Sequence, residues 1–153
     1  MRLSRLRFSA IVLLAASSPG LASQPIGLVM QANFSFGSIV ASGTAGTVTV
    51  TPASLRSSAG GVVLGSGVGV HAATFQASGA LEMSFSIVLP SSVTLTSGGS
   101  TMTMNTFTSN PSGSGTIGIG GTTTVTVGAT LNVGANQSTG SYTGSLPVTV
   151  AYS

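Results

Sequence analysis

Hydrophobic and polar residues alternate along most of the chain beyond residue 25. The first alternating run is Ile26–Phe36. The clearest is Leu81–Leu89, in which the odd-numbered residues are apolar and Glu82, Ser84 and Ser86 lie between them. A period of two residues is typical of a β-strand with one buried face, and this region has no stretch with the spacing of an amphipathic helix. The pattern predicts an all-β protein, with Leu81–Leu89 as a central strand whose odd-numbered side chains point inward.

Clusters of Gly, Ser, Asn and Pro separate the alternating runs and predict turns. The sequence Ser-Gly-Gly-Ser at residues 97–100 lies between the apolar positions of Val93–Leu95 and those of Met102–Met104. Paired glycines accept the positive φ angles of a tight turn, so these residues predict a hairpin. Gly120 and Gly121, between Ile117 and Val127, predict a second hairpin by the same reasoning. Roughly eight or nine short strands at this spacing predict an antiparallel β-sandwich.

The start of the chain has the pattern of a secretory signal peptide. Arg2, Arg5 and Arg7 precede the apolar stretch Phe8–Ala16, and a Ser-Ser-Pro-Gly break and small residues follow it. The apolar stretch is shorter than the roughly 20 residues of a membrane-spanning helix, and no later segment is longer. We therefore expect residues 1–22 to be a leader that is cut off before Ser23, and residues 23–153 to form a single exported domain without a membrane span.

The charge of the chain lies mostly in this leader. The whole sequence has four Lys+Arg residues, one Asp+Glu residue and a formal net charge of +3. Beyond the leader the only formally charged side chains are Arg56 and Glu82, so the predicted mature domain is neutral. A basic patch for nucleic acid is therefore not expected. The predicted location is the periplasm, the cell surface or the medium.

The side chains that carry most enzyme chemistry are almost absent. The chain has no Asp, Lys or Cys, and His71 and Glu82 are its only His and acidic residues. Acid–base catalysis and metal binding use clusters of such groups. A lone histidine is usually an ordinary loop or strand-end residue, and Glu82 with Arg56 would form at most an exposed ion pair worth about 1 kcal/mol. We expect no catalytic, cofactor-binding or metal-binding residues, and no enzyme activity.

The following segments carry a shared set of motifs: 34–39 (FSFGSI), 46–50 (GTVTV), 60–62 (GGV), 89–95 (LPSSVTL), 102–113 (MTMNTFTSNPSG), 140–144 (GSYTG) and 148–152 (VTVAY). Together they resemble bacterial domain-of-unknown-function family 4402. That family is similar to spore coat protein U domains and, more distantly, to chaperone-usher pilins, which are immunoglobulin-like sandwiches completed by a strand from a neighbouring subunit. The resemblance implies an immunoglobulin-like or pilin-like sandwich and a structural role in a bacterial surface fibre or coat. It also implies self-assembly or other fibre subunits as partners, with a periplasmic chaperone and usher.

The run Ile26–Phe36 has two interpretations. It is longer than the usual strand of about 5 or 6 residues and begins just after the predicted cut. In one interpretation residues 23–31 are a donor segment, and Ile26, Leu28 and Met30 fill a groove of a neighbouring subunit. In the other, the whole run is one strand of its own domain.

Two other functions remain open. An adhesin-like binding module is the first, although two Tyr and no Trp leave few rings on which a glycan could stack. A small outer-membrane β-barrel is the second, because such barrels also have alternating strands of about ten residues. The chain lacks the aromatic girdles of these barrels, which makes this function the weakest of the three.

Overall fold

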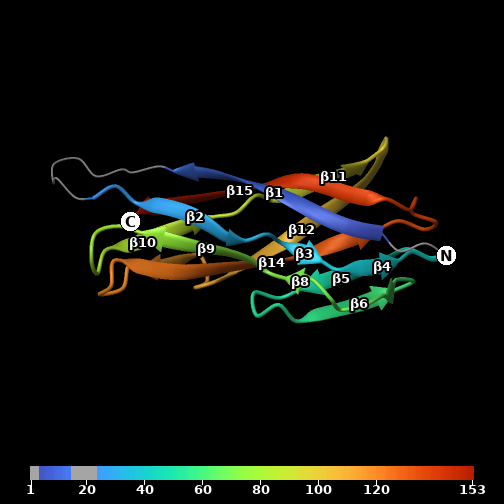
Figure 1. Cartoon of the computed structure of the whole chain (residues 1–153), viewed down its shortest axis with the longest axis horizontal. Coiled ribbons are helices and arrows are strands. Elements are labelled where there is room, and N and C mark those ends of the chain that lie inside the picture. The colour runs from blue at the N-terminus through green and yellow to red at the C-terminus, as the bar shows by residue number, and fades with distance from the viewer. Residues whose placement is uncertain (1–3, 15–23) are drawn as a thin grey trace.

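The computed structural model describes residues 4–14 and 24–153, and within these residues it contains β-strands and no helix. Two layers of strands form an elongated sandwich around a hydrophobic core (Figure 1). The predicted all-β sandwich is therefore confirmed. None of the described residues belongs to a helix long and apolar enough to cross a membrane.

Strand β14 (Thr122–Val133) is the centre of the first layer. On one side it pairs with β12 (Ser100–Asn110). On the other side its first half pairs with β9 (Ala73–Ser78) and its second half with β5 (Gly46–Val50). Two successive partners thus share one long strand, which places residues from distant parts of the sequence in a single sheet.

The edges of this layer are two short strands. Strand β2 (Gly27–Ala32) pairs with β9, and β6 (Arg56–Gly60) pairs with β5. Strand β11 (Ser92–Ser97) pairs with β12 along its length and meets the other layer at Thr96. The β11–β12 hairpin is the predicted one, because Gly98 and Gly99 both adopt positive φ angles, 54° and 92°, in its two-residue turn.

Strand β15 (Ser141–Tyr152) is the centre of the second layer. It pairs in parallel with β1 (Ser4–Leu14) and in antiparallel fashion with β10 (Ser84–Val88). Beyond β10 lies β13 (Ser114–Thr116), and beyond β1 lies β4 (Ser38–Val40). The β1–β15 pair is parallel, whereas the other strand pairs of the described residues are antiparallel.

Three very short strands complete the sandwich. Strand β7 (Val63–Leu64) pairs with β4, and β3 (Ser35–Phe36) pairs with β8 (Val70–His71) in a small separate sheet. The rings of Phe34 and Phe36 meet edge to face, with centroids 4.7 Å apart, and both side chains are buried.

Alternate residues of the two long central strands form a large part of the core. Its members on β14 and β15 are buried, as the period-two pattern predicts. Tyr142 is fully buried at the start of β15, and its hydroxyl donates a 2.6 Å hydrogen bond to the carbonyl of Ser138 in the preceding turn. This bond is similar to the tyrosine corner of immunoglobulin-type sandwiches. The alternate core residues are Val125, Val127, Ala129, Leu131 and Val133 on β14, and Tyr142, Leu146, Val148, Val150 and Tyr152 on β15.

The strands are more numerous than the sequence predicts, and two of the predicted strands are divided or shortened. The expected run Ile26–Phe36 is divided between β2 and β3, and Gly37, with a φ of 71°, separates β3 from β4. The expected strand Leu81–Leu89 is confined to β10, because Glu82 has a φ of 59° and turns the chain before it. Leu81 is consequently 59% exposed, which contradicts its predicted inward position, whereas Phe85 and Ile87 are buried as expected.

The hairpin predicted around Gly120 and Gly121 is wrong. Gly121 donates a hydrogen bond to the carbonyl of Gly118, so these residues do form a turn. The strands on either side of it, however, do not pair with each other, because β13 pairs with β10 and β14 pairs with β9. Strand β10 also lies between β15 and the three-residue β13, so it is less central than predicted.

Candidate strand-addition site

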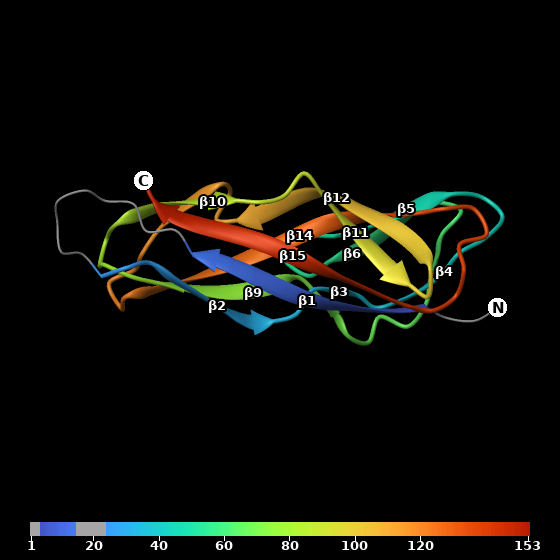
Figure 2. The same cartoon turned by 90° about the horizontal axis from the view of Figure 1, so that it is seen from above.

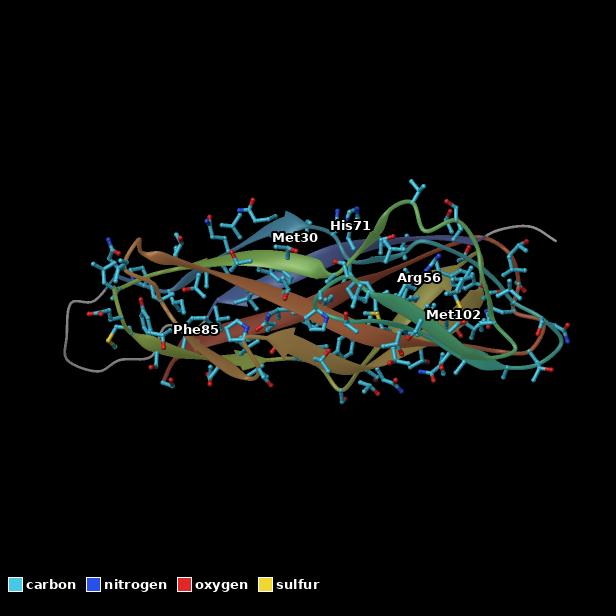
Figure 3. All side chains as sticks on the ribbon, turned by 90° about the horizontal axis from the view of Figure 1, so that it is seen from below. Met30, Arg56, His71, Phe85 and Met102 are labelled. Atoms are coloured by element: carbon cyan, nitrogen blue, oxygen red, sulfur yellow. The ribbon has the colours of Figure 1, made fainter. Side chains whose placement is uncertain are left out.

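The titratable side chains of the domain lie in different places. His71 is exposed on β8, and Arg56 begins β6 (Figure 3). Glu82 is exposed in the turn before β10. The described residues contain no group of three or more His, Cys, Asp or Glu side chains that could hold a metal ion. Within these residues the fold does not assemble His71 and Glu82 into one site.

The guanidinium group of Arg56 binds the backbone of its own domain. Its Nη1 atom donates to the carbonyls of Phe36 and Ser38, each at 3.0 Å, and its Nη2 atom donates to the carbonyl of Gly65 at 2.8 Å. These bonds connect β3, β4 and the loop after β7. The suggested ion pair of Arg56 with Glu82 is not formed, because the guanidinium group is directed to these carbonyls.

An open hollow of about 540 Å³ lies beside strands β5, β12 and β14. The residues around it are neutral and include Thr103, Asn132 and Gln137. The side chain of Gln137 donates hydrogen bonds to the carbonyl of Thr101 and to the hydroxyl of Tyr142, at 3.0 and 2.8 Å. The side-chain amide of Gln137 therefore stabilises the turn that precedes β15.

The proposed donor residues lie in the folded chain as follows. Ile26 and Leu28 are 2% and 5% exposed and belong to the chain's own core, while Met30 is partly buried against it. Strand β2 pairs with β9 of the same chain, with Leu28 opposite Ala77 and Met30 opposite Phe75. The segment packs on its own domain in this structure, although the run is divided between β2 and β3 and is not the single strand of the second interpretation. Donation of the segment to another subunit stays a prediction.

The main feature of the second layer is the strand formed by the predicted leader. Strand β1 follows β15 in parallel from the pair Arg5–Ser141 to the pair Leu14–Val150, an unbroken register over the whole of that span. Both strands are seen side by side in two perpendicular views (Figures 1 and 2). Four even-numbered positions of β1 are the register partners of buried residues of β15, namely Leu6 with Tyr142, Ala10 with Leu146, Val12 with Val148 and Leu14 with Val150.

Strand β1 has β15 on one side over residues 5–14 and β4 on the other side at its first two residues. On the side away from β15, its first residues pair with β4, with Ser4 opposite Ile39 and Arg5 opposite Ser38. It also lies against β2 and β3. On the other side of β15, β11 pairs at Thr143 and β10 begins to pair at Thr149. Along residues 144–148, β1 is therefore the strand that pairs with β15.

The sequence contained two signals for this site. Pro147 lies inside β15, and a proline within a strand is typical of sheet edges because it cannot donate to the ladder. The alternating residues of β15 also lack any charged side chain. The interpretation of residues 1–22 as a leader removed these residues from the predicted fold, so the pairing of β1 with β15 was not expected.

The comparisons with known proteins give the family. The family model described as "Domain of unknown function (DUF4402)" matches residues 27–152, and the chain therefore belongs to this family, as its motifs predicted. No curated protein and no solved structure matches the chain. The matched residues begin with β2 and end in β15, so they contain the sandwich without β1.

Proposed function

We propose that the protein is an exported, non-catalytic structural subunit of a bacterial surface fibre or coat, in which subunits join by strand addition. The observation that carries this proposal is the pairing of β15 with β1. Residues 4–14 belong to the predicted leader, and their removal on export would leave the edge of a central strand without its partner. Such an edge offers unpaired N–H and C=O groups to another chain.

The chemistry of the domain supports an assembly role. Beyond the leader, the domain has one histidine, His71, and two formally charged side chains, Glu82 and Arg56. The guanidinium group of Arg56 donates hydrogen bonds to backbone carbonyls. Exposed sheet edges usually carry charged side chains that discourage strand addition. On the edge strand β6, residues Ser57–Gly60 are exposed and uncharged, so this part of the edge has no charged side chains to discourage strand addition.

Export and fibre formation can be tested together in cells. A C-terminal epitope tag would report the location of the chain, and N-terminal sequencing of the tagged product should begin at or near Ser23. Electron microscopy should show a surface fibre or coat that is lost when the gene is deleted and returns with the wild-type gene. A tagged product that stays in the cytoplasm with its leader intact, or an unchanged cell surface after deletion, would contradict the proposal.

A further inference from the structure

We propose that two copies of the chain meet end to end, with an apolar tip of one copy seated in the open hollow of the next. The tip consists of the two turns at residues 79–83 and 117–121, and the hollow is the one beside β5, β12 and β14. This inference rests on the proposed function, because it concerns a contact between the subunits of a fibre.

The tip presents two large apolar side chains to solvent. Leu81 is 59% exposed and Ile119 is 86% exposed. A Cβ atom on Gly121 would lie 3.7 Å from the side chain of Leu81, so Leu81 of the first turn lies beside the second turn. Exposed apolar side chains gain free energy when another surface covers them. The tip therefore favours an apolar partner.

Backbone hydrogen bonds hold the two turns together as one unit. The N–H of Glu82 donates to the carbonyl of Ile117, and the N–H of Ile117 donates to the carbonyl of Met83, both at 2.9 Å. The N–H of Gly79 donates to the carbonyl of Gly121 at 3.1 Å. Because these bonds already order the backbone of the tip, little conformational entropy is lost when a partner covers it.

The hollow lies at the opposite end of β14 from the tip. The tip directly precedes Thr122, the first residue of β14, whereas Asn132 and Val133 at the other end of the strand line the hollow. These two ends of the strand are roughly 36 Å apart. Figure 1 shows β9 and β10 toward one end of the sandwich and β5 toward the other. A tip therefore cannot enter the hollow of its own chain, but it can enter that of a second copy placed in line.

The chemistry of the hollow matches that of the tip. The hollow has no charged lining residue, and Met102 and Val133 contribute apolar groups to it. Its volume of about 540 Å³ is within the range of pockets that hold a drug-sized ligand, so two branched side chains fit. Thr101 and Thr103 are exposed, and their hydroxyl groups can bond to backbone groups around the two apolar side chains. An apolar centre with a polar rim is typical of protein interfaces.

The contact joins two different surfaces, so it repeats along a line of copies. Each copy keeps one tip and one hollow available at opposite ends, which is the condition for an open filament. Two side chains bury far less than the roughly 1,200 Å² of a stable interface, so one such contact is weak. Within a fibre that strand addition also holds together, the high effective concentration of the next subunit favours it.

Disulfide trapping in the full chain tests the contact. The chain has no cysteine, so Thr103→Cys in the hollow and Ile119→Cys in the tip introduce the only thiols. Under a mild oxidant we expect the double variant to form a ladder of disulfide-linked multimers, whereas each single variant stays monomeric on a non-reducing gel. The matched control pairs Thr103→Cys with Val29→Cys and should give no ladder, because Val29 is also exposed but lies on β2.

A further substitution tests the apolar part of the contact. Leu81→Ser, added to the Thr103→Cys and Ile119→Cys variant, should lower the yield of multimers about tenfold, because it removes an apolar side chain that the contact buries. Val88→Ser is the control, since Val88 is 58% exposed outside the tip and should leave the yield unchanged. Circular dichroism establishes that each variant is folded.

Three results would overturn the inference: a double variant that stays monomeric, an equal ladder from the Val29→Cys control, or an unchanged yield with Leu81→Ser. The same thiols separate the inference from the proposed function in cells. Surface fibres whose subunits do not crosslink through these thiols would leave the proposed function standing and exclude the end-to-end contact. A ladder from the purified chain, in cells without surface fibres, would support the contact and contradict the proposed function.

Discussion

The hydroxyl group of Tyr152 donates a 2.7 Å hydrogen bond to the backbone carbonyl of Gln24. The same hydroxyl accepts a 2.7 Å hydrogen bond from the backbone N–H of Ala80. One side chain near the end of β15 thus holds both the residues before β2 and the turn after β9. The segment that follows the predicted cut is therefore tied to the second layer of its own domain.

Tyr152→Phe should destabilise the domain by about 1–3 kcal/mol, because it removes the hydroxyl and leaves two backbone groups without a partner in a partly buried place. The ring is retained, so the loss reports the hydrogen bonds. Chemical denaturation measures the change in the free energy of unfolding. Ser153→Ala is the control, since Ser153 is exposed and should have little effect. Equal stability of the Phe variant and the wild type would show that these bonds are unimportant.

Leu28→Ala should lower the free energy of unfolding by roughly 2–5 kcal/mol, because the Leu28 side chain is only 5% exposed and its truncation leaves a cavity. Val29 is the matched control, because it is the next residue of β2 and is 58% exposed. Val29→Ala should change stability by no more than about 0.5 kcal/mol. Similar losses from the two variants would contradict the position of β2 in the core.

Paired Leu28→Asp and Met30→Asp substitutions separate core packing from donation in cells. Because β2 packs on its own domain, we expect these changes to deplete the folded protein in a periplasmic extract. A variant that accumulates there as a folded domain, and that has lost only its surface fibres, would show instead that the segment serves a neighbouring subunit.

Phe85→Ala should cost about 3–5 kcal/mol, since the ring is fully buried and the substitution combines lost burial with a cavity. Ser84→Ala, on the exposed face of the same strand, should be nearly silent. Thermal or chemical unfolding of the two variants checks the register of β10. Equal destabilisation would mean that the register is wrong.

The period-two pattern predicted those parts of the fold that depend on burial alone. The alternate buried residues of β14 and β15 follow from it, because side chains alternate across a strand. The turn at Gly98 and Gly99 follows instead from the paired glycines, which accept positive φ angles. The pattern does not say which strands pair. It therefore missed that β13 pairs with β10 and not with β14.

Local backbone geometry explains the other differences. Glu82 adopts a positive φ that is uncommon for a residue with a side chain, and nothing in the alternation of Leu81–Leu89 indicates it. The candidate site was missed for another reason. Its strand β1 has the composition of a leader, and the pairing of such a segment with β15 depends on the gap in the sheet, which no local pattern records.

Elemental analysis of the purified protein should find no stoichiometric metal, and His71→Ala should leave the metal content and the stability nearly unchanged. His71 is exposed at the end of the two-residue strand β8, and the described residues offer it no cluster of further ligands. Structural and catalytic metal sites use three or four protein ligands. One equivalent of zinc or iron that disappears in the His71→Ala variant would contradict this prediction.

Gly128→Ala should destabilise the domain although alanine suits a strand at least as well as glycine does. Gly128 lies inside β14, and a Cβ atom there would lie 2.7 Å from the carbonyl carbon of Thr51 and 2.8 Å from the nitrogen of Pro52. Both are backbone atoms of the segment after β5, so they cannot move aside as a flexible side chain would. Overpacking of this kind costs about 1–3 kcal/mol.

Gly120→Ala is the matched control for this close approach. A Cβ atom at Gly120 would meet no atom within 4 Å, and Gly120 is not among the glycines with positive φ. The substitution should therefore be neutral or stabilise the domain by up to about 1 kcal/mol, because it restricts the unfolded chain. Urea unfolding of both variants measures the difference. If Gly128→Ala were as stable as Gly120→Ala, the segment after β5 would have to lie further from β14 than the structure places it, and the shared pairing of β14 with β9 and β5 would need revision.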